Sequence, residues 1–326
     1  MNLFSVKQYR SEDYEAWNQF VSEAKNATFL FHRDFMEYHS DRFEDFSLLV
    51  FNNKEKVVAI LPANRVDESV FSHQGLTYGG IIWLQKNKLV NALPIYISIL
   101  KYLKENGIQT IHFKLIPNFY CQQFSNELDY LLFVSKGKWK QSQCFSVVDL
   151  AQNLHFSETR KQLIKKLDVT KIKIKTDENL STFWNELLIP TLNNTFNAKP
   201  IHSLEEITLL KQNFPENIKQ FSIYKNNKII AGTTLFINKN VVHTQYIATL
   251  KDEEFKGTID YLIYHLMTEV FQDFDFFDFG SSNENDGKKI NKGLLFWKES
   301  FGAQTVVQNF YEVETANFEL LNTVLK

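Results

Sequence analysis

The residues with the clearest capacity for chemistry lie together near the C-terminal end of the sequence, over 274–302. A strongly apolar strand pattern, Phe274–Phe279, stops in a polar turn, and the short helical pattern after it carries one lysine, Lys298, among aromatic residues. A buried strand that opens into a polar loop is a common origin of sites in α/β proteins. A cation at that place could stabilise a tetrahedral intermediate, or hold a phosphate or a carboxylate. The alternative is a surface lysine whose stem lies over aromatic rings.

Two further residues could hold or move a proton near this lysine. Asp278 ends the strand, where a carboxylate serves either as a base or as an acceptor for the amides of the next loop. Tyr246 lies on the predicted strand 241–249. His243 has the opposite parity on that strand, so at most one of the two faces a common cleft, and Tyr246 fits better as a proton donor or acceptor. A lone histidine on a strand is more often structural.

Acyl transfer is the reaction that these residues could support. It needs a nucleophile held near an activated ester or thioester, donors aimed at the developing oxyanion, and a proton acceptor. The start of the predicted helix 258–271 adds backbone N–H groups and the positive end of a helix dipole for a phosphate. For the turn residues 281–283, turn formation alone is the competing explanation. The residues predicted to contact a donor or substrate are Gly257, Thr258, Gly280, Ser281, Ser282, Asn283 and Trp297.

Composition places the chain among globular proteins with a large aromatic core. Its 326 residues are 44% hydrophobic and 23% charged, with a net charge of −2, so nothing in the bulk charge demands a nucleic acid or an anionic membrane. The two cysteines, Cys121 and Cys144, fit neither a disulfide framework nor a metal-site spacing, and we expect reduced thiols and no metal. No signal peptide or membrane-length apolar run is present, which predicts a cytoplasmic protein.

The order of predicted elements occurs twice. The words Phe46-Ser47 and Phe221-Ser222, each followed by an Asn-Asn-Lys turn, lie 175 residues apart. Each copy is expected to contain a three-strand meander, a helix and a strand. The expected ranges are 46–51, 57–61, 70–80, 89–103 and 110–116, then 221–224, 229–237, 241–249, 258–271 and 274–279. The pattern predicts an α+β chain of two tandem domains, 1–150 and 151–326, each a mainly antiparallel sheet flanked by helices.

The most basic segment, 156–175, lies between the two copies. It is predicted to form a capped helix and then an alternating Lys/Ile strand. One interpretation is a solvated helix face and an edge strand guarded by lysines. The other is a patch for a phosphate-bearing donor or for a tRNA acceptor arm. The residues that would contact such an arm are Arg160, Lys161, Lys165 and Lys166.

The duplicated pattern resembles the GNAT acyltransferase fold, and the C-terminal words resemble its FemAB-like branch. Asp278-Phe279-Gly280, then Gly293 and Phe296-Trp297-Lys298, then Phe301-Gly302, look like the signature D-F-G … G-x-x-x-F-K … F-G, with one residue inserted before the lysine. The likeness covers nearly the whole chain. It implies two tandem GNAT-like domains, with the active site in the second domain and Lys298 as an electrostatic stabiliser.

The resemblance also implies the class of reaction. Fem-type peptidyltransferases use aminoacyl-tRNA, and related proteins acylate sugars or amino groups in envelope or polysaccharide synthesis. We therefore expect an acyl or aminoacyl transferase that acts on such a precursor, binds no cofactor tightly, and takes aminoacyl-tRNA or acyl-CoA as donor. The usual GNAT pyrophosphate loop, Q/R-x-x-G-x-G/A, is replaced by 254–259 with a single glycine, which predicts poor CoA binding. The alternatives are an acyl-CoA-dependent N-acetyltransferase and a catalytically inactive GNAT-fold binding module; solvent-inaccessible placement of Lys298 would favour the latter.

Overall fold

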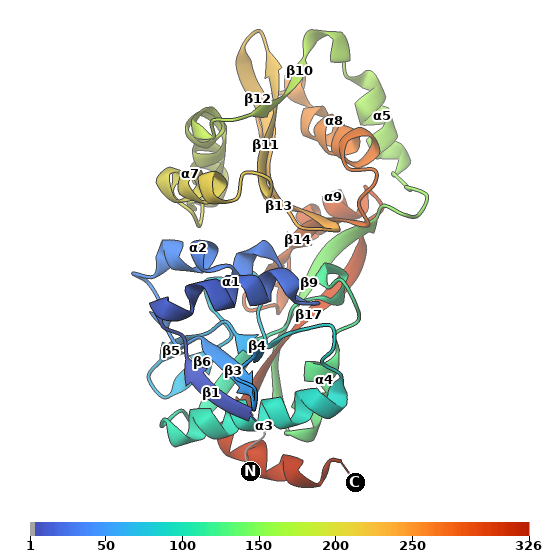
Figure 1. Cartoon of the computed structure of the whole chain (residues 1–326). Coiled ribbons are helices and arrows are strands. Elements are labelled where there is room, and N and C mark those ends of the chain that lie inside the picture. Colours follow the sequence, from blue (N-terminus) through green and yellow to red (C-terminus); the bar gives the residue numbers. More distant parts are fainter. Residues whose placement is uncertain (1–3, 326) are drawn as a thin grey trace. The chain divides into compact units, whose positions relative to one another are not determined.

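A computed structural model describes residues 4–325, except for the side chains of 195 and 196. The chain forms two compact units (Figure 1). The first unit consists of Met1–Gln143 and Val307–Lys326, and the second of Cys144–Val306. This division differs from the predicted one at residue 150, because the strand β17, Gln304–Glu314, returns the C-terminal segment to the first unit. There it pairs antiparallel with β8, Thr110–Lys114.

A mixed sheet with the order β10-β11-β12-β13-β14-β9 forms the centre of the second unit. Neighbouring strands are antiparallel, except for the parallel pair β13 and β14. The strands are β10 (Lys173–Asp177), β11 (Ile218–Lys225), β12 (Lys228–Ile237), β13 (Val241–Thr249), β14 (Phe276–Ser281) and the end of β9 (Lys138–Asp149). The predicted meander of the second copy is thus present as β11, β12 and β13.

Helices cover both faces of this sheet. Figure 1 shows α5 and α8 on one side of β11 and β12, and α7 on the other. On the α8 side, Phe277 and Phe279 of β14 belong to one buried cluster with Leu262 of α8. On the other side, the ring of Phe183 lies so close to Gly232 that an added Cβ would come within 2.7 Å of it. The helices are α5 (Glu158–Lys166), the π-helix Phe183–Leu188, α6 (Ile189–Phe196), α7 (Leu204–Asn213), α8 (Thr258–His265), the π-helix Leu266–Val270 and α9 (Lys292–Glu299).

The strands of the first unit are divided between two sheets. One has the order β1-β3-β4-β7, and in the other β17 is followed by β8-β6-β5-β2. The predicted single meander is therefore wrong in detail: the chain bends after β4 at Pro62, which has no N–H to donate to a ladder. The strands are β1 (Phe4–Gln8), β2 (Glu44–Asp45), β3 (Leu48–Asn52), β4 (Val57–Leu61), β5 (Asn64–Val66), β6 (Ser69–Phe71), β7 (Ile82–Trp83) and β8.

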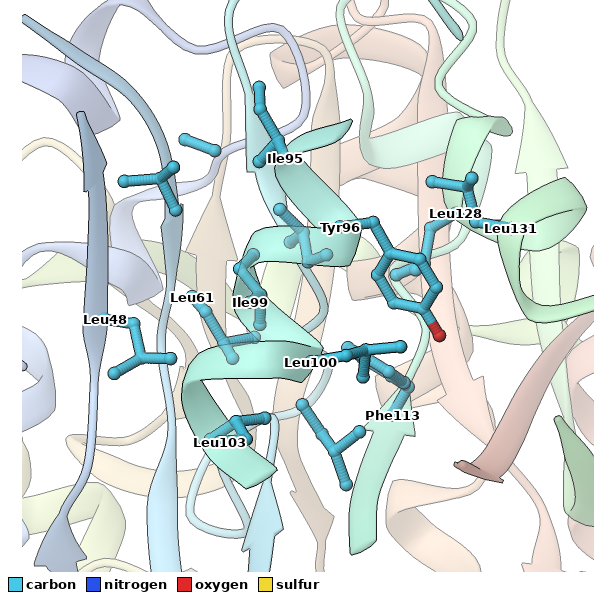
Figure 2. Close-up of a cluster of buried hydrophobic side chains, with 14 of the residues drawn as sticks. Leu48, Leu61, Ile95, Tyr96, Ile99, Leu100, Leu103, Phe113, Leu128 and Leu131 are labelled. Carbon is cyan, nitrogen blue, oxygen red and sulfur yellow. The ribbon is translucent and has the colours of Figure 1, made fainter. Parts of the chain in front are cut away.

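The core of the first unit forms around its longest helix, α3, Leu89–Glu105 (Figure 2). Leu93, Tyr96, Ile99, Leu100 and Leu103 of α3 are buried in one cluster with apolar residues of the sheets. The other helices are α1 (Tyr14–Glu23), α2 (Arg33–Met36) and α4 (Glu127–Val134). Turns of 3-10 helix occupy Ser11–Asp13, Phe29–Phe31, Glu37–His39, Asn118–Tyr120, Val169–Lys171, Glu253–Phe255 and Thr315–Thr323.

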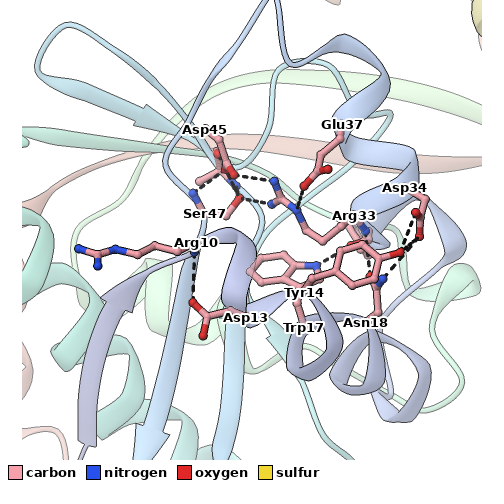
Figure 3. Close-up of polar contacts among 12 residues, drawn as sticks. Arg10, Asp13, Tyr14, Trp17, Asn18, Arg33, Asp34, Glu37, Asp45 and Ser47 are labelled. Atoms are coloured by element: carbon pink, nitrogen blue, oxygen red, sulfur yellow. Dashed lines mark hydrogen bonds and ion pairs between the residues drawn. The ribbon is translucent and has the colours of Figure 1, made fainter.

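A buried arginine fixes the N-terminal helices of the first unit to its strands (Figure 3). Arg33 of α2 donates hydrogen bonds to Glu37, to Ser47 and, at 2.6 Å, to Asp45. Its guanidinium carbon lies 3.8 Å from the ring centre of Tyr9. Because the guanidinium of Arg33 is both paired with carboxylates and stacked on a ring, the free-energy cost of removing its charge from water is compensated. We therefore interpret this cluster as structural.

In the first unit, the chain at Gly79 packs closely against the ends of the parallel strands β6 and β8. Gly79 bridges to Leu115 and donates its N–H to Lys114 at 2.6 Å, and an added Cβ would lie 1.7 Å from the carbonyl oxygen of Ser72. We therefore expect Gly79→Ala to lower the free energy of unfolding of this unit by about 2–3 kcal/mol, measured by urea titration. Gly293→Ala is the control, since its Cβ would meet only an Asn291 oxygen at 3.7 Å. Equal stability of the two variants would contradict the steric argument.

Candidate active site

The candidate site begins where the parallel strands β13 and β14 stop pairing. Their register contains three pairs, and the last of these is His243 with Asp278. Beyond Asp278 the register of β14 against β9 shifts before Ser281, and Gly280 has a φ of +67°, a conformation that favours glycine. The sequence predicts the site at the turn around Gly280. The pairing of β13 with β14 ends two residues before it, at Asp278.

Asp278 is completely buried and has a fixed set of partners. One carboxylate oxygen lies 2.8 Å from Nδ1 of His243, and the other accepts the N–H of Gly280 at 2.7 Å. The side chain of His243 is 12% exposed, whereas that of Asp278 is not exposed at all. The imidazole is therefore the part of this pair that solvent or a ligand can reach.

Lys298 is brought to the same turn by α9. Asn291 caps the helix by accepting the N–H of Leu294 at 3.0 Å, and this sets the direction of a helix whose last turn carries the lysine. The Nζ of Lys298 donates to the carbonyl oxygens of Gly280, at 3.0 Å, and Ser281, at 2.8 Å. Lys298 is only 3% exposed, and burial lowers its pKa to about 8 even though the nearby Asp278 acts in the opposite direction.

The polar turn after β14 is held by its own side chains. The Oδ1 of Asn283 lies 2.9 Å from the hydroxyl of Ser281 and accepts the N–H of Cys144 at 2.6 Å. Ser282 is 4% exposed, and in the described part of the chain its hydroxyl has no hydrogen-bond partner. The turn continues into a small hairpin of β15 (Asn283–Glu284) and β16 (Lys289–Ile290). Ser281 and Asn283 are therefore structural as well as close to Lys298.

Tyr246 lies on β13, the strand of His243, but its side chain has different partners. Its hydroxyl accepts the backbone N–H of His202 at 3.1 Å and lies 2.7 Å from Nδ1 of that residue, and its ring meets Trp184 edge-on. Burial raises the pKa of Tyr246, which does not favour a role as a proton donor. The hydroxyl and the ring of Tyr246 are therefore engaged by His202 and Trp184.

A β-bulge in β13 overturns the parity argument about His243 and Tyr246. Thr234 of β12 pairs with Tyr246 but the next residue, Leu235, pairs with Thr244, so Gln245 is an extra residue in β13. The bulge reverses the alternation of side chains: Val242 and Ile247, an odd number of residues apart, both belong to the core on the α8 side. His243 and Tyr246 therefore share the opposite face.

The start of α8 borders a second feature, an open hollow of about 340 Å³. Gly257 has a φ of +87° as the residue before the helix, and the hydroxyl of the buried Thr258 donates to Phe255 O at 2.6 Å. The hollow is lined by four lysines and by acidic residues that neutralise part of their charge. The charged lining consists of Lys166, Lys171, Lys225, Lys256, Asp168, Glu253 and Glu254.

The basic helix α5 is not uniformly exposed. Lys161, Lys165 and Lys166 are exposed, but Arg160 is 7% exposed and forms an ion pair with Asp260 of α8. This corrects the prediction that Arg160 lies on a surface for tRNA. Trp297 also points inward, because its indole N–H donates to the same carboxylate at 2.9 Å. Both residues hold α5, α8 and α9 together rather than lining the turn at Gly280.

Two features are absent from residues 4–325. Within residues 4–325, no three His, Cys, Asp or Glu side chains gather in a way that could hold a metal ion. No helix in that range combines the length and the apolar character needed to cross a membrane. Both cysteines are free thiols.

The first unit provides an internal comparison for the site. Its parallel strands β6 and β8 also share three register pairs, and the last pair is Phe71 with His112. These two rings stack with centroids 4.4 Å apart, where the second unit has His243 and Asp278. The carboxylate–imidazole pair is therefore present in the second unit and replaced by an aromatic stack at the matching position of the first.

Several solved structures are similar to the chain over almost its full length. FemX has a TM-score of 0.67 at 9% identity, covering 98% of this chain and 99% of FemX. The chain has the fold of FemX. L-PGS from Bacillus licheniformis has a TM-score of 0.56 at 11% identity, covering 97% and 96% of the two chains. A tandem GNAT protein from the clavulanic acid biosynthesis pathway has a TM-score of 0.52 at 8% identity, covering 96% and 98%. No protein-family model and no curated protein sequence matches.

The turn at Gly280 remains the predicted site, and sequence reasoning missed two buried contacts of the second unit. His243 was set aside because it stood alone on a strand, and only the register shows that it faces Asp278. The Arg160–Asp260 pair was missed because the residues are 100 positions apart. The order of strand, helix and strand was the available signal for the first pair, since it is the usual connection between parallel neighbouring strands.

Proposed function

We propose that the protein is an acyl or aminoacyl transferase whose acceptor is an amine or hydroxyl of a cell-envelope or polysaccharide precursor. The observation that carries the proposal is the constellation on β14, where His243 bonds to Asp278 and Lys298 bonds to the turn that follows, in a FemX-like fold. A fixed cation and backbone dipoles beside a reachable imidazole suit a reaction that develops an oxyanion and releases a proton.

The donor is proposed to be an aminoacyl-tRNA. The start of α8 has one glycine, and three of the lysines that line its hollow are paired with acidic neighbours: Lys171 with Asp168, Lys225 with Glu254, and Lys256 with Glu253. This arrangement leaves less positive charge for a compact pyrophosphate than four unpaired lysines would. The exposed lysines of α5, of which Lys161 forms an exposed ion pair with Glu158, instead offer charges spaced along a helix of the kind that contact a nucleic acid backbone.

The burial of Lys298 favours a second candidate function, a catalytically inactive binding module. At 3% exposure its ammonium group contacts two carbonyl oxygens of its own chain. Against this, the same pair of bonds fixes the turn that follows Asp278, so the lysine can act through the turn while the reachable His243 meets the acceptor. The two candidates differ in whether any donor is consumed.

A donor screen distinguishes these functions. The full-length protein is incubated with total aminoacylated tRNA or with acetyl-CoA, and with a nucleotide-linked peptidoglycan peptide that carries a free lysine amine. Mass spectrometry then detects the acylated peptide. We expect product with aminoacylated tRNA. Product with acetyl-CoA alone would assign the N-acetyltransferase activity, and binding of the peptide without product from either donor would assign the binding module.

The exposed lysines of α5 supply a separate prediction. Changing Lys161, Lys165 and Lys166 together to glutamine should weaken tRNA binding and reduce the slope of log affinity against log salt by about 2–3, because each phosphate contact contributes just under one. Filter binding over a salt series measures both quantities. The matched control removes three exposed lysines of the first unit, Lys54, Lys56 and Lys88. An equal loss in the control would show that the effect is one of net charge alone.

A further inference from the structure

We infer that His243 is the catalytic residue that removes the proton from the acceptor, and that Asp278 is the residue that positions it. The inference rests on the proposed function and assigns the proton-transfer step within it. It reverses the expectation that Asp278 or Tyr246 would be the base. The contacts of each of these three residues determine the assignment.

The hydrogen bonds of Asp278 fix the state of the imidazole. Both carboxylate oxygens are occupied, one by Nδ1 of His243 at 2.8 Å and one by the N–H of Gly280 at 2.7 Å. An ionised carboxylate can only accept, so Nδ1 carries the hydrogen and Nε2 keeps its lone pair. Asp278 has no exposed surface and cannot meet an acceptor, whereas His243 can.

The backbone of Gly280 lies against the ring of His243. An added Cβ at Gly280 would come within 3.2 Å of Cε1 of His243, and its φ of +67° suits glycine. On the neighbouring strand β12, the partner of His243 is the uncharged Phe236. Among titratable groups, Asp278 of β14 bonds the imidazole, Lys298 of α9 bonds the carbonyl oxygen of Gly280 beside it, and Tyr246 lies on the same face of β13.

The first unit shows that the fold does not need this pair. At the matching register position it has Phe71 and His112 in a ring stack. His112 also lies 3.4 Å from the hydroxyl of Thr110 through Nε2. The second unit instead places a fully buried carboxylate behind a partly exposed imidazole, an arrangement that stabilises an imidazolium when it forms.

His243 carries one proton from the acceptor to the leaving group during the transfer. The acceptor nitrogen or oxygen attacks the carbonyl carbon of the donor ester, and its proton passes to Nε2 of His243. The tetrahedral intermediate then collapses, the bond between the carbonyl carbon and the leaving oxygen breaks, and the imidazolium returns the proton to that oxygen. Asp278 keeps its hydrogen bond to Nδ1 throughout, and the histidine ends in its starting state.

The test compares His243→Gln, Asp278→Asn and the control His155→Gln, an exposed histidine of the same unit, with total aminoacylated tRNA and the lysine-bearing peptide. We expect His243→Gln to lower kcat by about 10²–10⁴-fold with little change in KM, and to remove the ascending limb of the pH–rate profile. Asp278→Asn should lower kcat as well. The control should match the wild type, and thermal unfolding verifies that each variant is folded.

The outcomes separate this inference from the function on which it depends. If the wild type transfers and folded His243→Gln keeps the same ascending limb, the base assignment is overturned while the transferase function stands. Loss of rate in His243→Gln together with a rise in KM and an unchanged pH profile would also overturn it, because that result marks a binding residue. If the wild type transfers nothing from either donor, the proposed function fails and this step fails with it.

Discussion

Replacement of Lys298 by methionine should lower kcat by about 10²–10³-fold, an effect similar in size to the loss of one oxyanion-hole donor. The ammonium group holds two successive carbonyl oxygens, those of Gly280 and Ser281, directly after the residue that positions His243. Without it, the turn loses both its anchor and the positive charge nearest to Asp278. Steady-state kinetics on the wild type and the variant measure the change.

The stability of the same variant should change much less than its activity. Depression of the pKa from 10.5 to about 8 corresponds to roughly 3 kcal/mol against the buried cation at neutral pH, and methionine removes that cost. The two hydrogen bonds that are lost stabilise the turn by roughly 1.5–3 kcal/mol each. Because these effects oppose each other, we expect the free energy of unfolding to change by no more than about 3 kcal/mol.

The pH dependence provides a control on the role of the lysine charge. A folded pKa below the unfolded one means that the unfolded state binds more protons between about pH 8 and 10.5, so the wild type gains stability relative to Lys298→Met as pH rises through that window. If the cation is needed for transfer, activity falls as pH rises through about 8. A rate that is flat from pH 7 to 9, or a Lys298→Met variant with wild-type kcat, would contradict the assigned role.

The parts of the structure that sequence reasoning predicted are those with a local signal. The apolar strand at Phe276–Phe279, its polar turn and the aromatic helix around Lys298 each have a periodicity or a composition of their own, and the turn at Gly280 follows from them. The duplication was visible because the same order of elements occurs twice.

The parts that escaped prediction depend on pairing between distant segments. One extra residue in β13, Gln245, reverses the faces of His243 and Tyr246, and no composition signal marks it. The return of β17 to β8 depends on register across more than 200 residues of sequence, from Thr110 to Glu314. The sequence does not distinguish which of several consecutive basic residues are buried. In the structure the helix buries Arg160 and exposes Lys161.

Arg160 should prove a residue of stability rather than of tRNA binding. Its guanidinium pairs with Asp260, donates twice to the hydroxyl of Ser300, at 3.0 and 2.8 Å, and lies 4.8 Å from the ring centre of Phe301. Arg160→Met leaves the Asp260 carboxylate buried without its cation, and breaking such a pair costs about 3–5 kcal/mol. Urea unfolding should show a loss of that size in the second unit.

Two companion variants distinguish the buried pair from a surface charge. Lys161→Met changes the next residue, whose ion pair with Glu158 is exposed, and should cost less than about 1 kcal/mol. Arg160→Met combined with Asp260→Leu removes both charges and should recover much of the loss, because the unpaired carboxylate is the main cost. The opposite result would be an Arg160→Met variant that unfolds like the wild type but binds tRNA as weakly as the lysine variants. That result would place the guanidinium on the surface, as part of the basic face that the sequence first suggested.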